Sequence, residues 1–482
     1  MRLALKLGIA LSVSALLLYL GINAGEILPH RTAPVSGLQK LTLKQPVDPL
    51  KPVISLEELG LQAQFIVEVS LESDGQPLAH KVEITGNQAV IHGSPVAAVL
   101  DLDHAFTLNV RTSDGTRVAV SFKTAGLPDI TETASRQVVF VPAMPEKGFH
   151  WPYYLAIPSS GNRTQNDGHR RYLMIDTTNT GGRKSIDEML SRARSEVADR
   201  RQVSIATADE LGLPLLYPAF PRPDVTYVYQ GESNQFYTHA LDRDTATLHV
   251  KMSDPAGAEA LTPAFQKAGY DVQTFLRLDL QLSAMIDHAI EYLNQYGHKV
   301  EPHKVFLSGY SGSGTFVDRY TFLQPDRVKA VASGATVDDM VLPLAEYKGE
   351  RLIFPIGAGD YQEITGRSFN LAQHNQAARL IFMGEADENN TLPYGDCYGQ
   401  RERQIITSLW GPDILPRAQA LTKLYEQSGG KGMIILDKGI KHSMSPAMQE
   451  YMKAFIAANR DADQPVYPLP SDAEQLKFTL MK

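Results

Sequence analysis

The stretch that decides the fold is Lys304-Val305-Phe306-Leu307-Ser308-Gly309-Tyr310-Ser311-Gly312-Ser313-Gly314. A short apolar run ends in small residues on both sides of one serine, which predicts a β-strand, a tight turn and a helix in immediate succession. The glycines near Ser311 allow the backbone to adopt the strained geometry that exposes a side chain at such a turn. We interpret the stretch as a nucleophile elbow with Ser311 as the nucleophile.

A serine hydroxyl is a weak nucleophile at neutral pH, so this interpretation requires a histidine base and a carboxylate that orients it. Further along the chain, the apolar run 379–384 predicts a strand that ends just before Asp387. A second predicted strand, 433–436, is followed by His442 and then by a helical pattern. We therefore predict Asp387 as the acid and His442 as the base.

The order serine, acid, histidine is the one that α/β-hydrolases use. On these residues the region 150–460 resembles the α/β-hydrolase superfamily, with Ser311, Asp387 and His442 matching its nucleophile, acid and base. The resemblance implies an α/β fold with a doubly wound, mostly parallel sheet, and the style is that of secreted esterases and polyester depolymerases. The elbow pattern G-x-S-x-G is not met in full, because Ser313 takes the last position and the next glycine is Gly314.

Each member of the trio has an alternative reading. The stretch around Ser311 could be an ordinary loop that caps a helix, and His442 could be a solvated loop histidine. Other carboxylates also lie at suitable places for the acid. They are Glu385, Glu388 and Asp396 near the first candidate, and Asp338 or Asp339 after the predicted strand 328–332.

An oxyanion hole needs two backbone N–H groups aimed at the developing charge. Gly312, directly after the nucleophile, is the first candidate. The second donor is expected in the loop after the predicted strand 171–176, where Asn179 and Thr180 are the candidates. The alternative is a glycine-rich turn of no catalytic consequence.

Strand and helix signals alternate through the catalytic region, as a doubly wound sheet requires. The predicted strands are 213–217, 305–309, 328–332, 380–383 and 433–436, and a long amphipathic helix is expected over 279–296. Two stretches exceed a minimal fold, 218–266 and 357–376. They predict either a cap over the site or peripheral decoration.

A different pattern precedes the catalytic region. Short runs with period-two alternation at 63–71, 81–84, 89–91, 106–110 and 117–122, separated by turn signals, predict a small β-sandwich of immunoglobulin-like type. This accessory domain spans residues 61–125, and its simplest role is a spacer or a packing partner. A proline-rich tether at 26–60, a linker at 126–149 and a carboxyl-terminal tail at 461–482 complete the predicted organisation.

Composition narrows the classes of function. The chain has 482 residues, more than one core usually supports, so we expect two domains or one large, decorated domain, and 43% hydrophobic residues is an ordinary globular composition. A net charge of −8 argues against a nucleic-acid partner. One cysteine, Cys397, excludes a disulfide within the chain. No metal or organic cofactor is implied, since His239, His288 and His298 lack ligand spacing.

The first residues predict an export signal. Met1–Lys6 carries positive charge and 7–22 is apolar, so residues 1–25 are interpreted as a signal peptide or an inner-membrane anchor. We expect a periplasmic or extracellular serine hydrolase that cleaves small or polymeric carboxylic esters through an acyl-enzyme. The alternatives are a serine peptidase and a non-catalytic binding protein on the same scaffold; the oligomeric state stays open.

Overall fold

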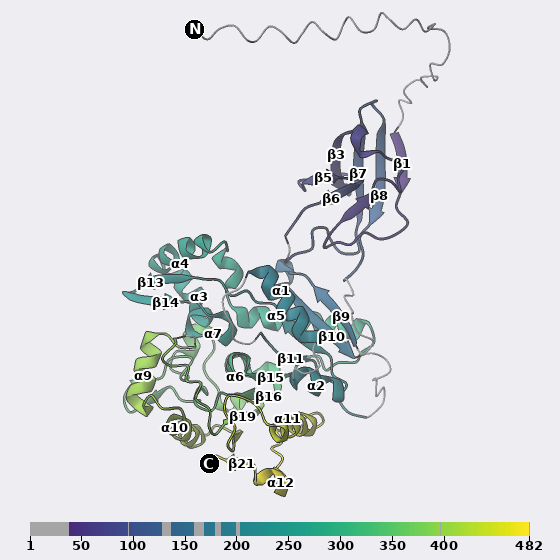
Figure 1. Ribbon diagram of the computed structural model, residues 1–482. Coiled ribbons are helices and arrows are strands. Elements are labelled where there is room, and N and C mark those ends of the chain that lie inside the picture. The colour runs from purple at the N-terminus through teal and green to yellow at the C-terminus, as the bar shows by residue number, and fades with distance from the viewer. Residues whose placement is uncertain are drawn as a thin grey trace, which may run out of the picture.

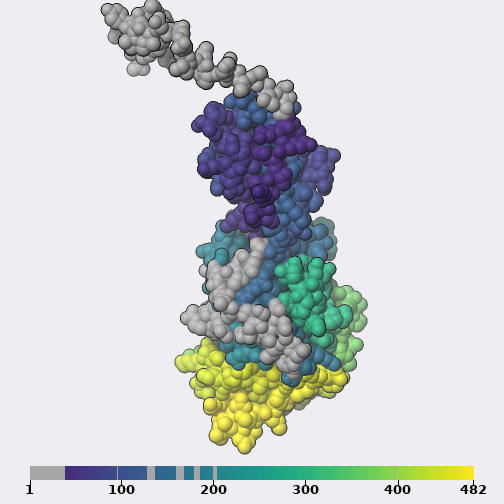
Figure 2. All heavy atoms as spheres, turned by 90° about the vertical axis from the view of Figure 1, so that its right-hand side faces the viewer, coloured from purple at the N-terminus to yellow at the C-terminus, as the bar shows by residue number. Residues whose placement is uncertain are grey.

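The computed structural model describes residues 38–94, 96–127, 136–158, 168–178, 185–198, 203–395 and 397–481. An all-β part comes first in the chain and a larger α/β part follows it (Figure 1). Figure 2 shows the all-β part in purple at one end of the molecule and the carboxyl-terminal residues in yellow at the other. No helix in the described ranges is long and apolar enough to cross a membrane, and the predicted signal segment 1–25 lies outside them.

Eight strands build the all-β part: β1 (Leu38–Thr42), β2 (Val53–Ser55), β3 (Ile66–Ser73), β4 (Gln76–Leu78), β5 (Val82–Thr85), β6 (Gln88–Ile91), β7 (Ala105–Thr112) and β8 (Arg117–Lys123). One sheet has the order β1-β8-β7-β3-β4 and the other the order β2-β6-β5. Buried residues alternate along β7 and β8, and Leu108 and Val120 share one apolar core with Ile54 and Ala89. The immunoglobulin-like classification of this pair of sheets stays a prediction.

A nine-stranded sheet forms the centre of the α/β part, in the order β21-β20-β19-β16-β15-β11-β12-β10-β9. Its strands are β9 (Arg136–Val141), β10 (Tyr153–Pro158), β11 (Met174–Ile175), β12 (Leu215–Pro218), β15 (Val305–Tyr310), β16 (Val328–Gly334), β19 (Ala378–Gly384), β20 (Met433–Asp437) and β21 (Phe478–Leu480). The six strands from β12 to β20 are parallel, whereas β10 and β21 run antiparallel to their neighbours. The sheet is therefore mixed and mostly parallel, as predicted.

Helices cover both faces of this sheet. They are α1 (Ile186–Ala198), α2 (Val203–Glu210), α5 (Leu278–Gln295), α6 (Gly312–Leu323), α9 (Gln400–Trp410), α10 (Ile414–Gln427) and α11 (Pro446–Ala458), whereas the short α12 (Asp472–Gln475) buries no side chain. Successive strand residues point to opposite faces, so Leu307 packs with α5 and α6 while Phe306 packs with α1, α2 and α11. This two-sided covering is the doubly wound arrangement that the sequence predicts.

The two long insertions each add helices or strands, and they contact each other through the ion pair of Arg243 with Asp360. The first contains β13 (Thr226–Tyr229), β14 (Glu232–Gln235), the 3₁₀ turn η4 (Thr238–Ala240), α3 (Arg243–Ser253) and α4 (Pro255–Lys267). The second contains α7 (Tyr361–Thr365) and α8 (Leu371–His374). Arg319 of α6 donates a hydrogen bond to the Ala240 carbonyl at 3.0 Å, so the first insertion packs on α6. Its role as a cap stays a prediction.

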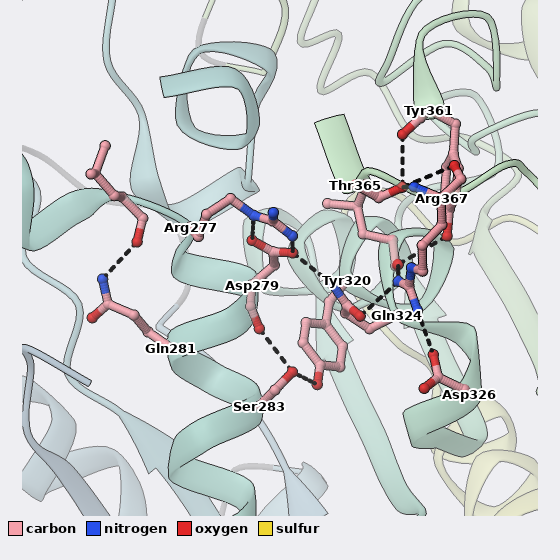
Figure 3. A network of polar contacts seen from close by, with 12 residues as sticks. Arg277, Asp279, Gln281, Ser283, Tyr320, Gln324, Asp326, Tyr361, Thr365 and Arg367 are labelled. Carbon is pink, nitrogen blue, oxygen red and sulfur yellow. Dashed lines mark hydrogen bonds and ion pairs between the residues drawn. The ribbon is translucent and has the colours of Figure 1, made fainter. Parts of the chain in front are cut away.

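A polar network ties the carboxyl-terminal end of α6 to the start of α5 (Figure 3). The Asp279 carboxylate, 1% exposed, accepts two hydrogen bonds from the Arg277 guanidinium at 2.9 and 2.8 Å and one from Gln324 Nε2 at 2.8 Å. The hydroxyls of Ser283 and Tyr320 form a further bond of 2.9 Å between the same two helices. These bonds fix α6, which begins at the predicted nucleophile turn.

The structure differs from the predicted domain boundaries in three places. The stretch 26–60, predicted as a tether, contributes β1 and β2 to the all-β part. The predicted linker 126–149 contains β9, and the predicted tail 461–482 contains β21. β9 and β21 are edge strands of the large sheet that lie outside the strand-helix alternation, and β1 is largely exposed. Such strands lack the pattern that identifies central ones.

Candidate active site

Ser311 occupies the turn between β15 and α6 with a φ of 60° and a ψ of −130°. A positive φ is uncommon for a residue other than glycine, and such backbone strain costs about 1–3 kcal/mol. The Ser311 N–H donates to the Gly334 carbonyl of β16 at 3.0 Å, and the Thr315 N–H donates to the Ser311 carbonyl at 2.9 Å. Hydrogen bonds on both sides therefore hold the residue in the geometry of a nucleophile elbow.

Small residues around Ser311 make this turn sterically feasible. A Cβ on Gly309 would lie 2.5 Å from the Ser313 backbone, and one on Gly314 would lie 2.3 Å from the Gly334 carbonyl oxygen. The Ser313 hydroxyl accepts from the Tyr310 N–H at 2.9 Å and donates to the Tyr310 carbonyl at 3.0 Å. Gly314 thus allows the close approach of helix and sheet, while Ser313 closes the turn.

The structure brings the three predicted catalytic residues together. His442 Nε2 lies 2.9 Å from Ser311 Oγ, and His442 Nδ1 lies 2.8 Å from Asp387 Oδ2. The Asp387 side chain is 4% exposed and the His442 side chain 33% exposed. The other carboxylate oxygen, Asp387 Oδ1, accepts from the Asn389 N–H at 2.9 Å, which fixes the acid. This is the order of contacts that a serine nucleophile with a histidine base requires.

A glycine at the end of β19 allows the acid loop and the base loop to touch. A Cβ on Gly384 would lie 2.1 Å from the Lys441 carbonyl oxygen and 2.3 Å from that of Ile440. The Ala386 N–H donates to the Ile440 carbonyl at 2.9 Å. The loops after β19 and β20 are therefore joined backbone to backbone, immediately beside Asp387 and His442. Together with Ser311 these two side chains are called the relay below.

The alternative acids have other partners. Asp338 accepts from a buried arginine Nη2 at 2.5 Å, and Asp339 accepts from a threonine hydroxyl at 3.1 Å. Glu385 accepts from a backbone N–H at 3.4 Å, and Glu388 pairs with a lysine at 3.4 Å. Asp396 lies outside the described residues. Of the described candidates, Asp387 is the one that hydrogen-bonds the predicted base.

Of the residues predicted to form the oxyanion hole, the structure describes Gly312. Gly312 is buried and is the first residue of α6, where the positive end of the helix dipole favours a developing negative charge. Asn179 and Thr180 lie outside the described residues. Their predicted role as a second donor therefore stays a prediction.

Two residues beside the relay were missed by the sequence reasoning. The Tyr310 hydroxyl donates to the Ser443 carbonyl at 2.9 Å, and its ring lies 5.4 Å from the His442 ring. Burial, with the nearby Asp387 carboxylate, raises the pKa of Tyr310, so its hydroxyl keeps the proton that it donates. The Asn389 side-chain nitrogen lies 3.3 Å from His442 Nε2. The only sequence signal was the position of the tyrosine directly before the nucleophile.

Other features of the described residues lie apart from the relay. Two polar cavities adjoin the β13–β14 hairpin, α3 and the start of α9, and neither is lined by a predicted catalytic residue. Within the same ranges, no group of three or more His, Cys, Asp or Glu side chains is arranged to hold a metal ion. His288 Nδ1 instead forms a 2.7 Å hydrogen bond with the Tyr153 hydroxyl.

The arrangement of the sheet and the site defines the class of fold. The sheet is mixed and mostly parallel with helices on both faces, the serine turn follows β15, and the acid and the histidine follow β19 and β20. This is the fold of the α/β-hydrolase superfamily.

Comparisons with known proteins found distant matches among solved structures. No protein-family model matches the sequence, and no curated protein matches it. Among solved structures, the S-formylglutathione hydrolase from Agrobacterium tumefaciens is 12% identical, with a TM-score of 0.37 over 70% of this chain and 99% of that chain. Est1E from Butyrivibrio proteoclasticus is 12% identical, with a TM-score of 0.27 over 70% and 99%. FphF, a fluorophosphonate-binding serine hydrolase from Staphylococcus aureus, is 12% identical, with a TM-score of 0.28 over 68% and 100%. Likeness at this level extends no activity or substrate to this chain.

Proposed function

We propose that the chain is a serine hydrolase that cleaves carboxylic esters through an acyl-enzyme intermediate. The single observation that carries the proposal is the continuous contact from Asp387 through His442 to Ser311, with heavy-atom distances of 2.8 and 2.9 Å. Both distances fall within the reach that proton transfer requires. The strained turn at Ser311 adds support, because such strain recurs at functional sites.

The proposed first step forms the acyl-enzyme. His442 Nε2 takes the proton of Ser311 Oγ as that oxygen bonds to the ester carbonyl carbon, and the carbonyl oxygen becomes an oxyanion. The Gly312 N–H and the amino-terminal end of α6 stabilise the oxyanion. Asp387 holds Nδ1–H of the ring and stabilises the imidazolium. When the carbonyl re-forms, the ester C–O bond breaks and the leaving alkoxide receives the proton from Nε2.

The second step returns the free enzyme. Water gives a proton to His442 Nε2 as its oxygen attacks the acyl carbon, and the bond from that carbon to Ser311 Oγ then breaks. The serine oxygen takes the proton back from the imidazolium and the carboxylic acid leaves. Protons move only among Ser311, His442, the substrate and water in these steps.

Labelling with a fluorophosphonate tests the activated serine. The probe reacts with an activated serine hydroxyl, so we expect stoichiometric modification of the purified protein, mapped by mass spectrometry to Ser311. Ser311→Ala is the control and should fold normally, remain unlabelled and lose ester hydrolysis. Hydrolysis at the wild-type rate by the alanine variant would refute the proposal. No labelling of folded wild type, together with no hydrolysis of an ester panel, would favour the non-catalytic binding protein.

Comparing esters with matched amides as substrates distinguishes an esterase from a serine peptidase. An ester needs no protonation of a strongly basic leaving amine, so aryl and alkyl esters of increasing acyl length should be cleaved in preference to matched amides. Faster cleavage of peptide amides than of the matched esters would replace the esterase by the serine peptidase. Polymeric esters belong in the panel because a secreted depolymerase is one version of the proposal.

Export is part of the proposal and needs its own measurement. We propose that residues 1–25 direct the chain out of the cytoplasm, that the protein works in the periplasm or outside the cell, and that the all-β part, from β1 to β8, acts as an immunoglobulin-like spacer domain. Cell fractionation followed by mass spectrometry of the amino terminus tests the signal. A mature chain beginning near Glu26 would indicate cleavage, a membrane-bound chain that keeps the segment would indicate an anchor, and a full-length cytoplasmic protein would refute export.

A further inference from the structure

Two aspartates that the sequence offers as alternative acids have a different place in the structure. Asp338 and Asp339 follow β16, the strand between β15 and β19, and both are buried. Asp338 accepts a hydrogen bond from α10, and Asp339 accepts one from the acid loop, residues 385–395, which follows β19 and carries Asp387. The proposed mechanism uses neither carboxylate, so their contacts beside the acid loop need another explanation.

The donor to Asp338 is Arg417 of α10, whose side chain is 0% exposed. Arg417 donates from Nη2 to Asp338 Oδ2 at 2.5 Å and from Nε to the Asp338 carbonyl at 3.2 Å. Nη2 also donates to Asn390 Oδ1 of the acid loop at 3.2 Å, and Nη1 donates to the Pro412 carbonyl at 2.9 Å. The N–H groups of an arginine form a rigid planar fork, so acceptors on three sides fix its orientation. Arg417 therefore joins the loop after β16, the acid loop and the start of α10.

The acid loop is held at two neighbouring positions, directly after the residue that fixes its carboxylate. Asn390 is bound from α10, and the Thr391 hydroxyl donates to the Asp339 carboxylate at 3.1 Å. One residue before Asn390, the Asn389 N–H donates to Asp387 Oδ1 at 2.9 Å. The consecutive residues 389, 390 and 391 therefore connect the buried charged groups with the proposed catalytic carboxylate.

Net stability alone is a weak reason for this buried pair of charges. The desolvation of a buried arginine and carboxylate offsets much of their attraction, and well-packed apolar residues of similar volume often stabilise a fold as well. Directed hydrogen bonds from one guanidinium to three segments of the chain supply something that apolar packing lacks, a defined position of each segment relative to the others. The segment whose position matters for the chemistry is the acid loop.

We propose that Arg417, Asp338 and Asp339, called the anchor below, are positioning residues that hold the Asp387 carboxylate against the base His442. The inference rests on the proposed function, because the place of the carboxylate matters only if the relay transfers a proton. The anchor acts through the acid loop. Asp387 stabilises the imidazolium best while the contact of Nδ1 with Oδ2 stays near 2.8 Å, so a loosened loop should slow the chemical step and leave substrate binding nearly unchanged.

The test changes the loop side of these contacts, because removing Arg417 leaves a buried carboxylate unpaired and endangers the fold. Asn390→Ala removes an acceptor of Arg417, and Thr391→Val removes the hydroxyl that binds Asp339 while it keeps the shape. In steady-state hydrolysis of an aryl ester, we expect each variant to lower kcat by roughly 10-fold or more with KM changed less than about 3-fold, the cost of a small misplacement of a reacting group. Thr391→Ser keeps the hydroxyl and should restore kcat to within about 3-fold of wild type.

A double-variant cycle with Asp387→Asn distinguishes positioning from a general loosening of the site. If the anchor acts through Asp387, Asn390→Ala should lower the residual kcat of Asp387→Asn by less than about 2-fold, because the contact that it supports is already impaired. A merely structural role would lower kcat by the same factor in both backgrounds. Thr422→Val is the matched control for Thr391→Val, since it removes a buried threonine hydroxyl of α10 that donates to the Ala418 carbonyl at 2.8 Å. This control should keep the wild-type kcat, and thermal unfolding checks that every variant is folded.

The outcomes separate this inference from the proposed function. Wild type that neither labels with the fluorophosphonate nor hydrolyses esters would remove the proposed function, and this inference with it. Wild type that does both, combined with folded Asn390→Ala and Thr391→Val variants of unchanged kcat, would overturn only the role of the anchor. Equal losses in the wild-type and Asp387→Asn backgrounds would overturn that role as well. If Asn390→Ala does not fold, the two Thr391 variants decide, and a loss in Thr391→Ser as large as that in Thr391→Val would overturn the role.

Discussion

The contact between the acid loop and the base loop can be broken by one methyl group. Gly384 ends β19, and a Cβ placed there would lie 2.1 Å from the Lys441 carbonyl oxygen. Lys441 directly precedes the base His442, and Gly384 lies three residues before the acid Asp387. The variant Gly384→Ala therefore pushes apart the two backbones that hold the relay, without changing any side chain of the relay itself.

The expected effect follows from the size of the clash. A Cβ and a carbonyl oxygen are essentially never closer than 3.0 Å, so the two loops must separate by about 0.9 Å. The hydrogen bond between His442 Nδ1 and Asp387 Oδ2, now 2.8 Å, would lengthen beyond good hydrogen-bond geometry if it took up most of that movement. A misplacement of roughly 1 Å at a reacting group can cost about 100-fold in rate. Overpacking should also lower the free energy of unfolding by about 1–3 kcal/mol.

The loss of kcat/KM in Gly384→Ala is measured by ester hydrolysis at several substrate concentrations. Thermal unfolding of the same variant checks that it is folded. Gly432→Ala is the matched control, because it lies beside the same pair of strands and its Cβ would meet the Arg379 carbonyl oxygen at 3.3 Å, which needs a shift of only a few tenths of an ångström. We expect the control to keep its rate within about 3-fold. A folded Gly384→Ala variant with kcat/KM near that of wild type would refute the view that backbone contact sets the relay.

Three more predictions follow from other contacts. Asp387→Asn should lower kcat for ester hydrolysis by up to about 10⁴-fold, because His442 loses the partner that sets its tautomer. A normal rate in this variant would show that another carboxylate is the catalytic acid. Asp279→Ala should lower the free energy of unfolding in urea by about 3 kcal/mol, since it leaves the mostly buried Arg277 without its carboxylate; a change under about 1 kcal/mol would contradict this. The native pKa of Asp176 is raised from 3.8 to about 7, so at this site the native state binds more protons than the unfolded state in this window, and the contribution of Asp176 to the free energy of unfolding falls as pH rises from 4 to 7. The stability of Asp176→Asn relative to wild type should therefore grow by roughly 4 kcal/mol between pH 4 and pH 8, and a constant difference in denaturation curves would contradict the shift.

The central part of the fold follows directly from local sequence patterns. The helix expected at 279–296 is α5, at Leu278–Gln295, and the run expected as a strand at 305–309 is β15, at Val305–Tyr310. These elements are long or wholly buried, so their apolar residues recur with the period of the element. The turn at Ser311 was also predictable, because a strand, small residues and a helix lie within a few positions of one another.

The peripheral elements could not be predicted in the same way. Only Leu41 is partly buried among the residues of β1, so no alternation marks the strand. β21 has three residues and forms only by pairing with β20, about 40 positions earlier in the chain. Such strands depend on a neighbour that is distant in the sequence, and tertiary context rather than propensity determines them.

Parts of the site depend on tertiary contacts as well. The residue type and the order of the chain suggested Asp387 and His442, but the need for glycine at position 384 arises from the carbonyls of Ile440 and Lys441, more than 50 residues later. Asp176 looks like any strand-terminal aspartate until α2 brings the Ser204 hydroxyl against it. Neither requirement leaves a local signature in the sequence.

Two features of the site oppose the stability of the fold, and they lie at the ends of adjacent strands. Ser311 holds a positive φ after β15, and Asp176, after β11, is a partly buried carboxyl group whose pKa desolvation raises to about 7. Each departs from the rules that a stable fold obeys, and such departures are expected to concentrate at functional sites. The Ser313 hydroxyl closes the strained turn through its two hydrogen bonds to the Tyr310 backbone. Backbone strain and a carboxyl group with a raised pKa therefore follow the two paired strands β11 and β15, and Gly312, where the proposed mechanism places the oxyanion, comes directly after the strained residue.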